Sequence, residues 1–148
     1  MGASKGIPIL ISLDAHANTD GQPEDTMRLI TTGQLFEAKD ETVIRYEESL
    51  DEGEPPQQIS ITVRDSVITM SRQGAFFANM VFQKGKRYES QYQTPYGSMD
   101  MALYCTKAVH TRTQDGGGEI ALQYQLDLSG QYAAMHDMKL HYMRKKEA

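Results

Sequence analysis

The residues that could do chemistry are few in this chain: one cysteine, Cys105, and four histidines. Two of the histidines, His136 and His141, are five residues apart, and on a β-strand that spacing points them to opposite faces, so they cannot share a metal ion. The same spacing separates Cys105 from His110 and predicts that they do not act as a nucleophile and its base. Cys105 shares its face with Leu103 and two methionines, which indicates a small buried residue. We therefore predict no catalytic residue and no metal site.

Sequence motifs for phosphate, metal or acyl-transfer chemistry are also absent. The three glycines at 116–118 are not followed by the Lys-Ser/Thr pair of a P-loop. The chain has no GxSxG nucleophile elbow, no HExxH or CxxC motif and no EF-hand loop. We expect no cofactor, and an enzyme is the least favoured class of function.

Two polar residues break an otherwise regular alternation of polar and apolar positions. Arg72 shares strand parity with Met70, and His136 shares it with Met138. If these faces line the inside of a barrel, a guanidinium and an imidazole lie inside it or at its rim. A buried guanidinium needs a partner, either a protein carboxylate or the acid group of a ligand. The alternatives are an Arg72 that reaches solvent from its strand end and a His136 satisfied within the core.

The segment YESQYQTPYGSMDM, residues 88–101, is the most distinctive part of the chain. Pro95 removes a backbone donor and Gly97 relieves the backbone, so TPYG predicts a bend between two strands. Tyr92 and Tyr96 could cover a barrel end beside this bend, and with Thr94 they join Arg72 and His136 as candidate ligand-binding residues. The alternative is that the bend is purely structural.

The elements that must position these residues are β-strands. Ile120, Leu122, Tyr124 and Leu126 alternate with polar neighbours, and the same two-residue period recurs along the chain. Turns are predicted at 65–66, 84–86, 115–118 and 129–130, and a loop at 51–57. Residues 97–112 are predicted to form a strand rather than a helix. We predict an all-β fold, an antiparallel up-and-down barrel of about eight to ten strands, with a two-sheet sandwich as the alternative.

Length and composition fit one domain over residues 1–148, with residues 1–6 expected to be disordered or left over from cloning. The 148 residues can bury one core without a disulfide or metal, and the net charge of −5 disfavours nucleic-acid binding. A lone cysteine fits a reducing cytoplasm, and there is no apolar run long enough to span a membrane. We expect a cytoplasmic protein with no nucleic-acid or membrane partner.

The chain resembles the YwiB-like family of small uncharacterised bacterial proteins. The resemblance rests on the order of TTGQLFE, RYEES, ITVRD–VITMSRQG, MVFQKGKR, TPYG and IALQYQLDLSGQ, over roughly residues 7–145. It implies a calycin-like, lipocalin-type barrel in a bacterial cytoplasmic protein, with Arg72, Gly74 and residues 94–97 at matching positions. It implies no activity. The chain has no Trp and so lacks the Gly-x-Trp opening of true lipocalins.

The function that these features favour is non-catalytic binding of a small, partly apolar ligand, which carries an acid group if Arg72 is its partner. The alternative is a protein-interaction module with a filled barrel, which contacts its partner through a strand edge or the TPYG end. The partner could be a second copy of this chain, which would form a homodimer. The state of the interior, open or filled, and the direction of Arg72 separate the two hypotheses.

Overall fold

The computed structural model describes residues 6–18, 24–49 and 55–145, and in these ranges it contains ten β-strands and no helix. The first five strands are β1 (Ile7–Asn18), β2 (Asp25–Ala38), β3 (Glu41–Glu48), β4 (Gln57–Arg64) and β5 (Val67–Gln73). The other five are β6 (Ala78–Phe82), β7 (Arg87–Thr94), β8 (Gly97–Arg112), β9 (Gly118–Leu128) and β10 (Gln131–Arg144).

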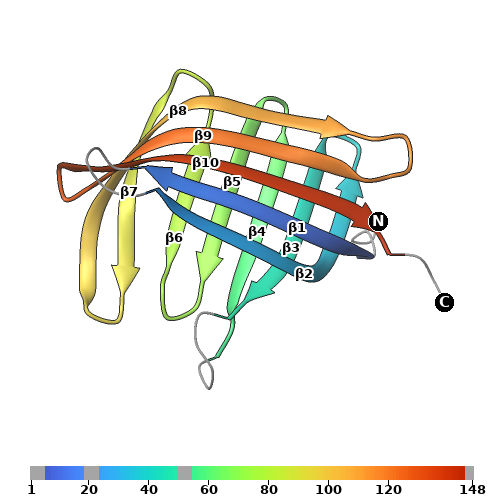
Figure 1. Cartoon of the computed structure of the whole chain (residues 1–148), viewed down its shortest axis with the longest axis horizontal. Coiled ribbons are helices and arrows are strands. Elements are labelled where there is room, and N and C mark those ends of the chain that lie inside the picture. The colour runs from blue at the N-terminus through green and yellow to red at the C-terminus, as the bar shows by residue number, and fades with distance from the viewer. Residues whose placement is uncertain (1–5, 19–23, 50–54, 146–148) are drawn as a thin grey trace.

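All ten strands form one antiparallel sheet in the order β6-β5-β4-β3-β2-β1-β10-β9-β8-β7. The two edge strands are joined by an isolated bridge, where Phe77 and Gln93 exchange backbone hydrogen bonds of 2.8 and 2.9 Å. Every strand therefore lies beside its sequence neighbours, and the sheet is a nearly closed barrel (Figure 1). The prediction of an antiparallel up-and-down barrel is confirmed.

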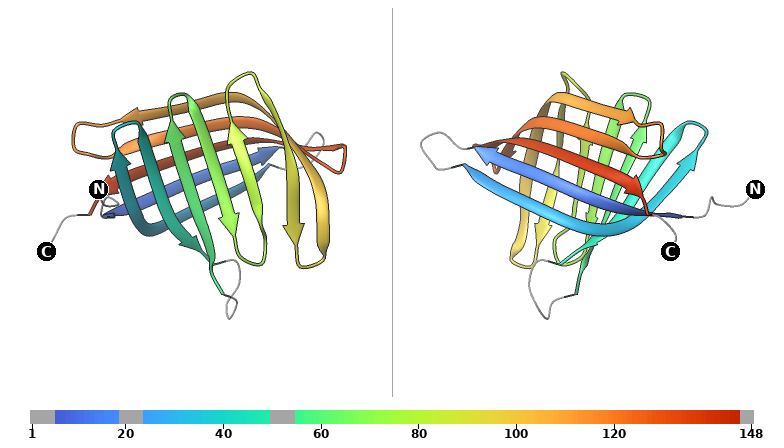
Figure 2. Two further views of the ribbon diagram at one scale, coloured as in Figure 1. Left: turned by 180° about the vertical axis from the view of Figure 1, so that it is seen from behind. Right: turned by 45° about the vertical axis from the view of Figure 1, so that its right-hand side comes forward.

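The long strands β1, β8, β9 and β10 cross the shorter strands β3 to β6 at a steep angle (Figure 2). Strand β2 bends at Gly33, where it passes from the group of long strands to the group of shorter strands. A Cβ at this position would overlap the Arg45 carbonyl oxygen, so only glycine permits the close approach. From Gly33 onward β2 pairs with β3, whereas residues 25–32 pair only with β1 among the described residues.

Side chains fill the middle of the barrel. The inward-facing positions of every strand except β7 contribute to one cluster of buried apolar residues, which extends from Ile9 and Ile11 on β1 to Leu140 and Tyr142 on β10. Cys105 is a fully buried member of it, as its apolar neighbours predicted, and burial raises the pKa of its thiol. Because this interior is filled, a ligand could be held only towards an end of the barrel.

One prediction about strand faces is wrong. Cys105 and His110 lie on the same inward face of β8, opposite Tyr124 and Ile120. A β-bulge between Cys105 and Lys107 shifts the register by one residue and reverses the parity that follows it. The two residues are still five positions apart along an extended strand, about 16 Å. They therefore cannot act as a nucleophile and base pair.

The predicted turns at 65–66, 84–86, 115–118 and 129–130 join consecutive strands, and 97–112 is the strand β8. Asp65 and Ser129 adopt positive φ, as do Gly85, Gly116 and Gly130. The prediction for residues 1–6 lies outside the described residues except for Gly6, and so does most of the predicted loop at 51–57.

Candidate functional site

Polar side chains enter the barrel from one end, which we call the mouth. The last residues of β3, the first residues of β4 and the connections β5–β6 and β7–β8 lie at this end. The mouth cluster consists of Tyr46 and Glu48 on β3, Gln57 on β4, Arg72 on β5 and Tyr124 on β9. Each of these residues has inward parity because its strand neighbours at two-residue spacing belong to the buried core.

Arg72 points inward and is paired within the protein. Its Nη1 donates to Glu48 Oε2 at 3.1 Å, and the side chains of Arg72 and Glu48 are 23% and 11% exposed. The partner of Arg72 is therefore a protein carboxylate, one of the two alternatives that the sequence left open. This pair has no net charge, and its residual exposure places it near the mouth rather than in the sealed core.

Gln57 is 2% exposed and stands opposite Glu48 in the β3–β4 register. Its Oε1 accepts a hydrogen bond from the Phe76 backbone N–H at 3.0 Å, which fixes the orientation of the side-chain amide. The other end of the amide, Nε2, is the one buried side-chain N or O atom without a hydrogen-bond partner among the described residues. Buried polar groups are nearly always satisfied, so this donor requires an explanation.

Tyr46 and Tyr124 add two phenol groups to the mouth cluster. Burial raises the pKa of both, that of Tyr124 to about 12, and the Arg72 charge partly opposes the rise at each. Glu48 raises the pKa of Tyr46 further. The raised pKa keeps both phenols neutral near pH 7. Neither hydroxyl is hydrogen-bonded to another described residue, so each has an unused donor and acceptor.

His136 lies on the inward face of β10 and stacks on Tyr124, with ring centroids 5.0 Å apart and planes 4° apart. Burial lowers the pKa of its imidazole. Tyr124 therefore interacts with two of the predicted residues: His136 on β10 stacks on its ring, and the charge of Arg72 on β5 acts on its hydroxyl. His136 also borders a hollow of about 500 Å³ that opens to the surface beside His16 and Glu24.

The other three predicted residues lie at the β7–β8 bend. Tyr92 is half-buried and packs against Phe76, with ring centroids 6.1 Å apart. Thr94 holds the bend together, because its hydroxyl donates to the Gly97 carbonyl at 2.9 Å and accepts from the Tyr96 N–H at 3.1 Å. Tyr96 is 96% exposed. Tyr92 thus reaches the Phe76 side of the mouth, whereas Tyr96 projects into solvent.

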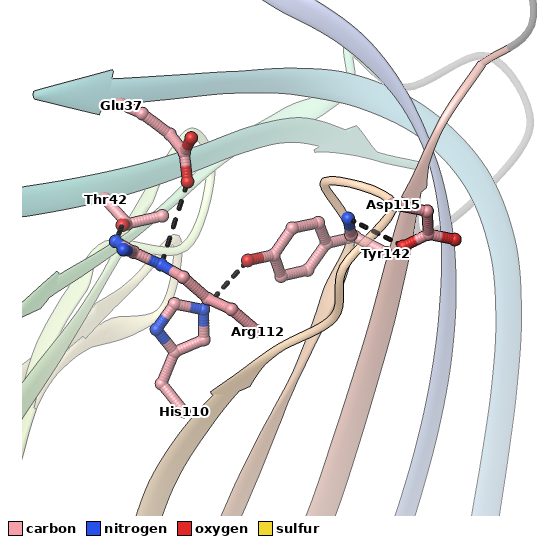
Figure 3. Close-up of polar contacts among 7 residues, drawn as sticks. Glu37, Thr42, His110, Arg112, Asp115 and Tyr142 are labelled. Carbon is pink, nitrogen blue, oxygen red and sulfur yellow. Dashed lines mark hydrogen bonds and ion pairs between the residues drawn. The ribbon is translucent and has the colours of Figure 1, made fainter.

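A second polar cluster lies near the opposite end, and we call it the hairpin-end cluster (Figure 3). It consists of Glu37, Thr42, His110, Arg112 and Tyr142. Arg112 donates to Thr42 Oγ1 at 2.6 Å and lies 3.8 Å from Glu37, while His110 Nε2 is hydrogen-bonded to the Tyr142 hydroxyl at 2.8 Å. Burial and the Arg112 charge lower the pKa of His110. Every member of this cluster has a partner.

Sequence reasoning missed Tyr46, Glu48, Gln57 and Tyr124 as members of a site. The signal was present in the alternation, because Tyr46 and Glu48 have the parity of a buried isoleucine on β3, and Gln57 has that of one on β4. A carboxylate and an amide at inward positions next to an inward arginine would have marked the mouth. The alternation of the sequence could not have shown which polar atoms remain without partners.

Neither a metal centre nor a membrane-spanning helix is found in the described ranges. They contain no group of three or more His, Cys, Asp or Glu side chains placed to hold a metal ion. They also contain no helix with the length and apolar composition needed to cross a bilayer.

The fold and the mouth cluster together define a ten-stranded antiparallel barrel with a filled core and a polar end. The chain belongs to the family described as a domain of unknown function, DUF1934, whose model matches residues 11–140. This confirms the resemblance seen in the sequence.

A relative and a solved structure from Bacillus subtilis are also similar to this chain. The chain is 22% identical to the uncharacterized β-barrel protein YwiB over 135 residues, which cover 91% of this chain and 92% of YwiB. The crystal structure of that protein is similar with a TM-score of 0.84 at 19% identity, over 97% of this chain and 96% of the other. At this identity the structural likeness establishes the fold alone.

Proposed function

We propose that this protein is a non-catalytic binding module that holds a small ligand at the mouth of the barrel. The observation that carries the proposal is the buried Gln57 Nε2, which lacks a partner among the described residues beside the Arg72–Glu48 pair. An unpaired buried donor costs about 1–3 kcal/mol, and a ligand that accepts its hydrogen bond removes that cost. The nearby phenols of Tyr46 and Tyr124 have unused hydrogen-bonding capacity in the same region.

The proposal narrows the hypothesis made from the sequence. A filled interior leaves no room for a ligand deep in the barrel, so the ligand occupies the mouth alone. Arg72 and His136 remain candidate ligand contacts, and Tyr92 borders the same end of the barrel. Thr94 and Tyr96 belong to the β7–β8 bend and are not included in the proposed site. A cytoplasmic location fits the lone free cysteine and remains a prediction, as does kinship with the calycins and lipocalins.

Native mass spectrometry after incubation with a bacterial metabolite extract tests the proposal. We expect the wild-type protein to retain an added mass that Gln57→Met does not retain. The matched control is Gln58→Met, because Gln58 lies next in sequence but is exposed and bonded to Glu47 on the outer face. A wild-type protein that retains no mass from the extract would overturn the proposal.

A second candidate function, a protein-interaction module, is favoured by the edge of β2 that is unpaired among the described strands. Residues 25–32 pair with β1 alone among the described strands, and Ile30 on this segment is 68% exposed. A strand segment paired on one side has backbone N–H and C=O groups that can accept a further strand. A second copy of this chain supplies such a strand, which makes a homodimer the simplest form of this candidate.

Sedimentation velocity tests this second candidate. If the edge of β2 pairs with a second copy, Ile30→Lys should shift a dimer towards the monomer, because an exposed lysine protects strand edges. A wild-type protein that stays monomeric at high concentration would exclude the homodimer.

A further inference from the structure

The charge balance of the mouth cluster limits the chemistry of a ligand held there, provided that the proposed binding at the mouth is right. The Arg72 guanidinium is neutralised by Glu48 at 3.1 Å, and the phenols of Tyr46 and Tyr124 are neutral because burial raises the pKa of each. His136 is uncharged near neutral pH because burial lowers its pKa. An anionic ligand would therefore find no free positive charge in the mouth cluster or on His136 beside Tyr124, and it would have to displace Glu48 from Arg72.

The hydrogen-bonding groups of the mouth offer more donors than acceptors. Gln57 Nε2 carries two N–H groups without partners among the described residues. Arg72 makes one hydrogen bond there and has five N–H donors in all, and the two phenols add one O–H each. The side-chain acceptors are the Glu48 oxygens, the phenol oxygens and one ring nitrogen of neutral His136. A ligand that suits this balance supplies oxygen acceptors.

The inner face of the strands next to His136 provides an apolar surface. Ala17 pairs with His136 across β1 and β10, and Ala15 pairs with Met27 across β1 and β2. Met27 is 45% exposed even though it shares the inward parity of the fully buried Leu35. In the same part of the barrel, β2 pairs with β1 alone among the described strands, because its pairing with β3 begins only at Gly33.

We propose that the ligand is an amphiphile whose polar end is an uncharged, oxygen-bearing group such as an amide, with Gln57 Nε2 as its principal donor. Its aliphatic part lies on Ala15, Ala17 and Met27. The Arg72–Glu48 pair stays intact when this ligand binds, and Glu48 thereby selects against carboxylates.

Isothermal titration of octanamide and octanoate, two probes of matched chain length, tests this inference near neutral pH. We expect the wild-type protein to bind octanamide about tenfold more tightly than octanoate, or better. The variant Glu48→Gln frees the Arg72 charge and should reverse that preference. The control Glu47→Gln removes the same charge from the exposed face of β3 and should leave the preference unchanged.

The outcomes separate this inference from the proposed function. If the wild-type protein binds octanoate as tightly as octanamide, or binds neither probe while retaining a mass from the extract, the inference is wrong and ligand binding at the mouth stands. If Glu47→Gln reverses the preference as Glu48→Gln does, the selection is a general charge effect and the inference is wrong as well. If neither probe binds and no mass is retained from the extract, both proposals fail.

Discussion

The two ends of the barrel hold polar clusters of similar composition and opposite character. In the hairpin-end cluster Arg112 reaches both Thr42 and Glu37, and His110 is bonded to Tyr142. In the mouth cluster the bond from arginine to glutamate is the one hydrogen bond between members, and Gln57 Nε2 has no partner among the described residues. Both clusters contain an arginine, a glutamate and a buried tyrosine, so residue type alone does not distinguish them.

The difference indicates which cluster belongs to the fold and which is available for function. A polar network whose groups are all paired stabilises and orients the strands that carry it. A buried group left unpaired destabilises the free protein, so it is expected where binding restores the missing bond. Matched substitutions at the two ends should therefore differ in their effects.

The largest effect is expected at Gly118, beside the hairpin-end cluster. A Cβ here would lie 2.5 Å from the Tyr142 hydroxyl and 2.7 Å from the Thr111 carbonyl oxygen. Gly118→Ala should destabilise the protein by about 2–3 kcal/mol, since both neighbours are fixed by the surrounding strands. Urea unfolding measures the change. An unchanged midpoint would show that this end is not tightly packed.

The next effect compares the two glutamates. Glu48→Gln leaves the mostly buried Arg72 without its counterion and should cost about 1–2 kcal/mol. Glu37→Gln should cost less than about 0.5 kcal/mol, because its contact with Arg112 is 3.8 Å long and more exposed. Equal losses in urea unfolding would contradict this explanation of the two ion pairs.

The tyrosines give the most closely matched comparison. Tyr142→Phe removes the bond to His110 and should cost about 1 kcal/mol. Tyr124→Phe removes a hydroxyl that bonds to no other described residue, so stability should change by less than about 0.5 kcal/mol. Thermal and urea unfolding of both variants provide the measurement. A loss at Tyr124 as large as that at Tyr142 would mean that the Tyr124 hydroxyl has a strong partner in the free protein.

The smallest effect is the pH dependence of stability from His110 at one end and His136 at the other. Both have a lowered pKa in the folded protein, mainly through burial, so the unfolded chain binds more protons as the pH falls below about 6.5. Their contribution to stability is complete above that value and is lost as the pH falls through the lowered pKa values. Urea midpoints measured from about pH 7.5 to about pH 5 should fall, and less steeply in His110→Gln. An identical slope in that variant would show that His110 does not contribute.

Most of the fold could be predicted from the sequence, because two-residue alternation and turn residues act locally. The alternation at 120–126 and the glycines at 85, 116 and 130 predicted strands and turns that the structure contains. The bulge after Cys105 could not be predicted, since nothing in the local pattern marks the residue at which pairing slips. Its effect was to reverse the expected face of His110.

The candidate site was only partly predictable. Arg72 and His136 stood out because a charged or polar residue on an apolar face is conspicuous. Their partners did not, because pairing of Arg72 with Glu48 depends on β3, β4 and β5 lying side by side. Stacking of His136 on Tyr124 depends likewise on the β9–β10 register.

Ligand binding at the mouth is tested most sharply by titrating the protein with octanamide and following the side-chain amide signals of Gln57 and Gln58 in nitrogen–proton NMR spectra. These neighbours on β4 differ in face, because Gln57 is buried at the mouth and Gln58 is exposed and bonded to Glu47. We expect the Gln57 amide signals to shift saturably while those of Gln58 stay in place. Gln57 signals that do not move as octanamide is added, or equal shifts of both amides, would show that the unpaired donor of the mouth does not bind this ligand.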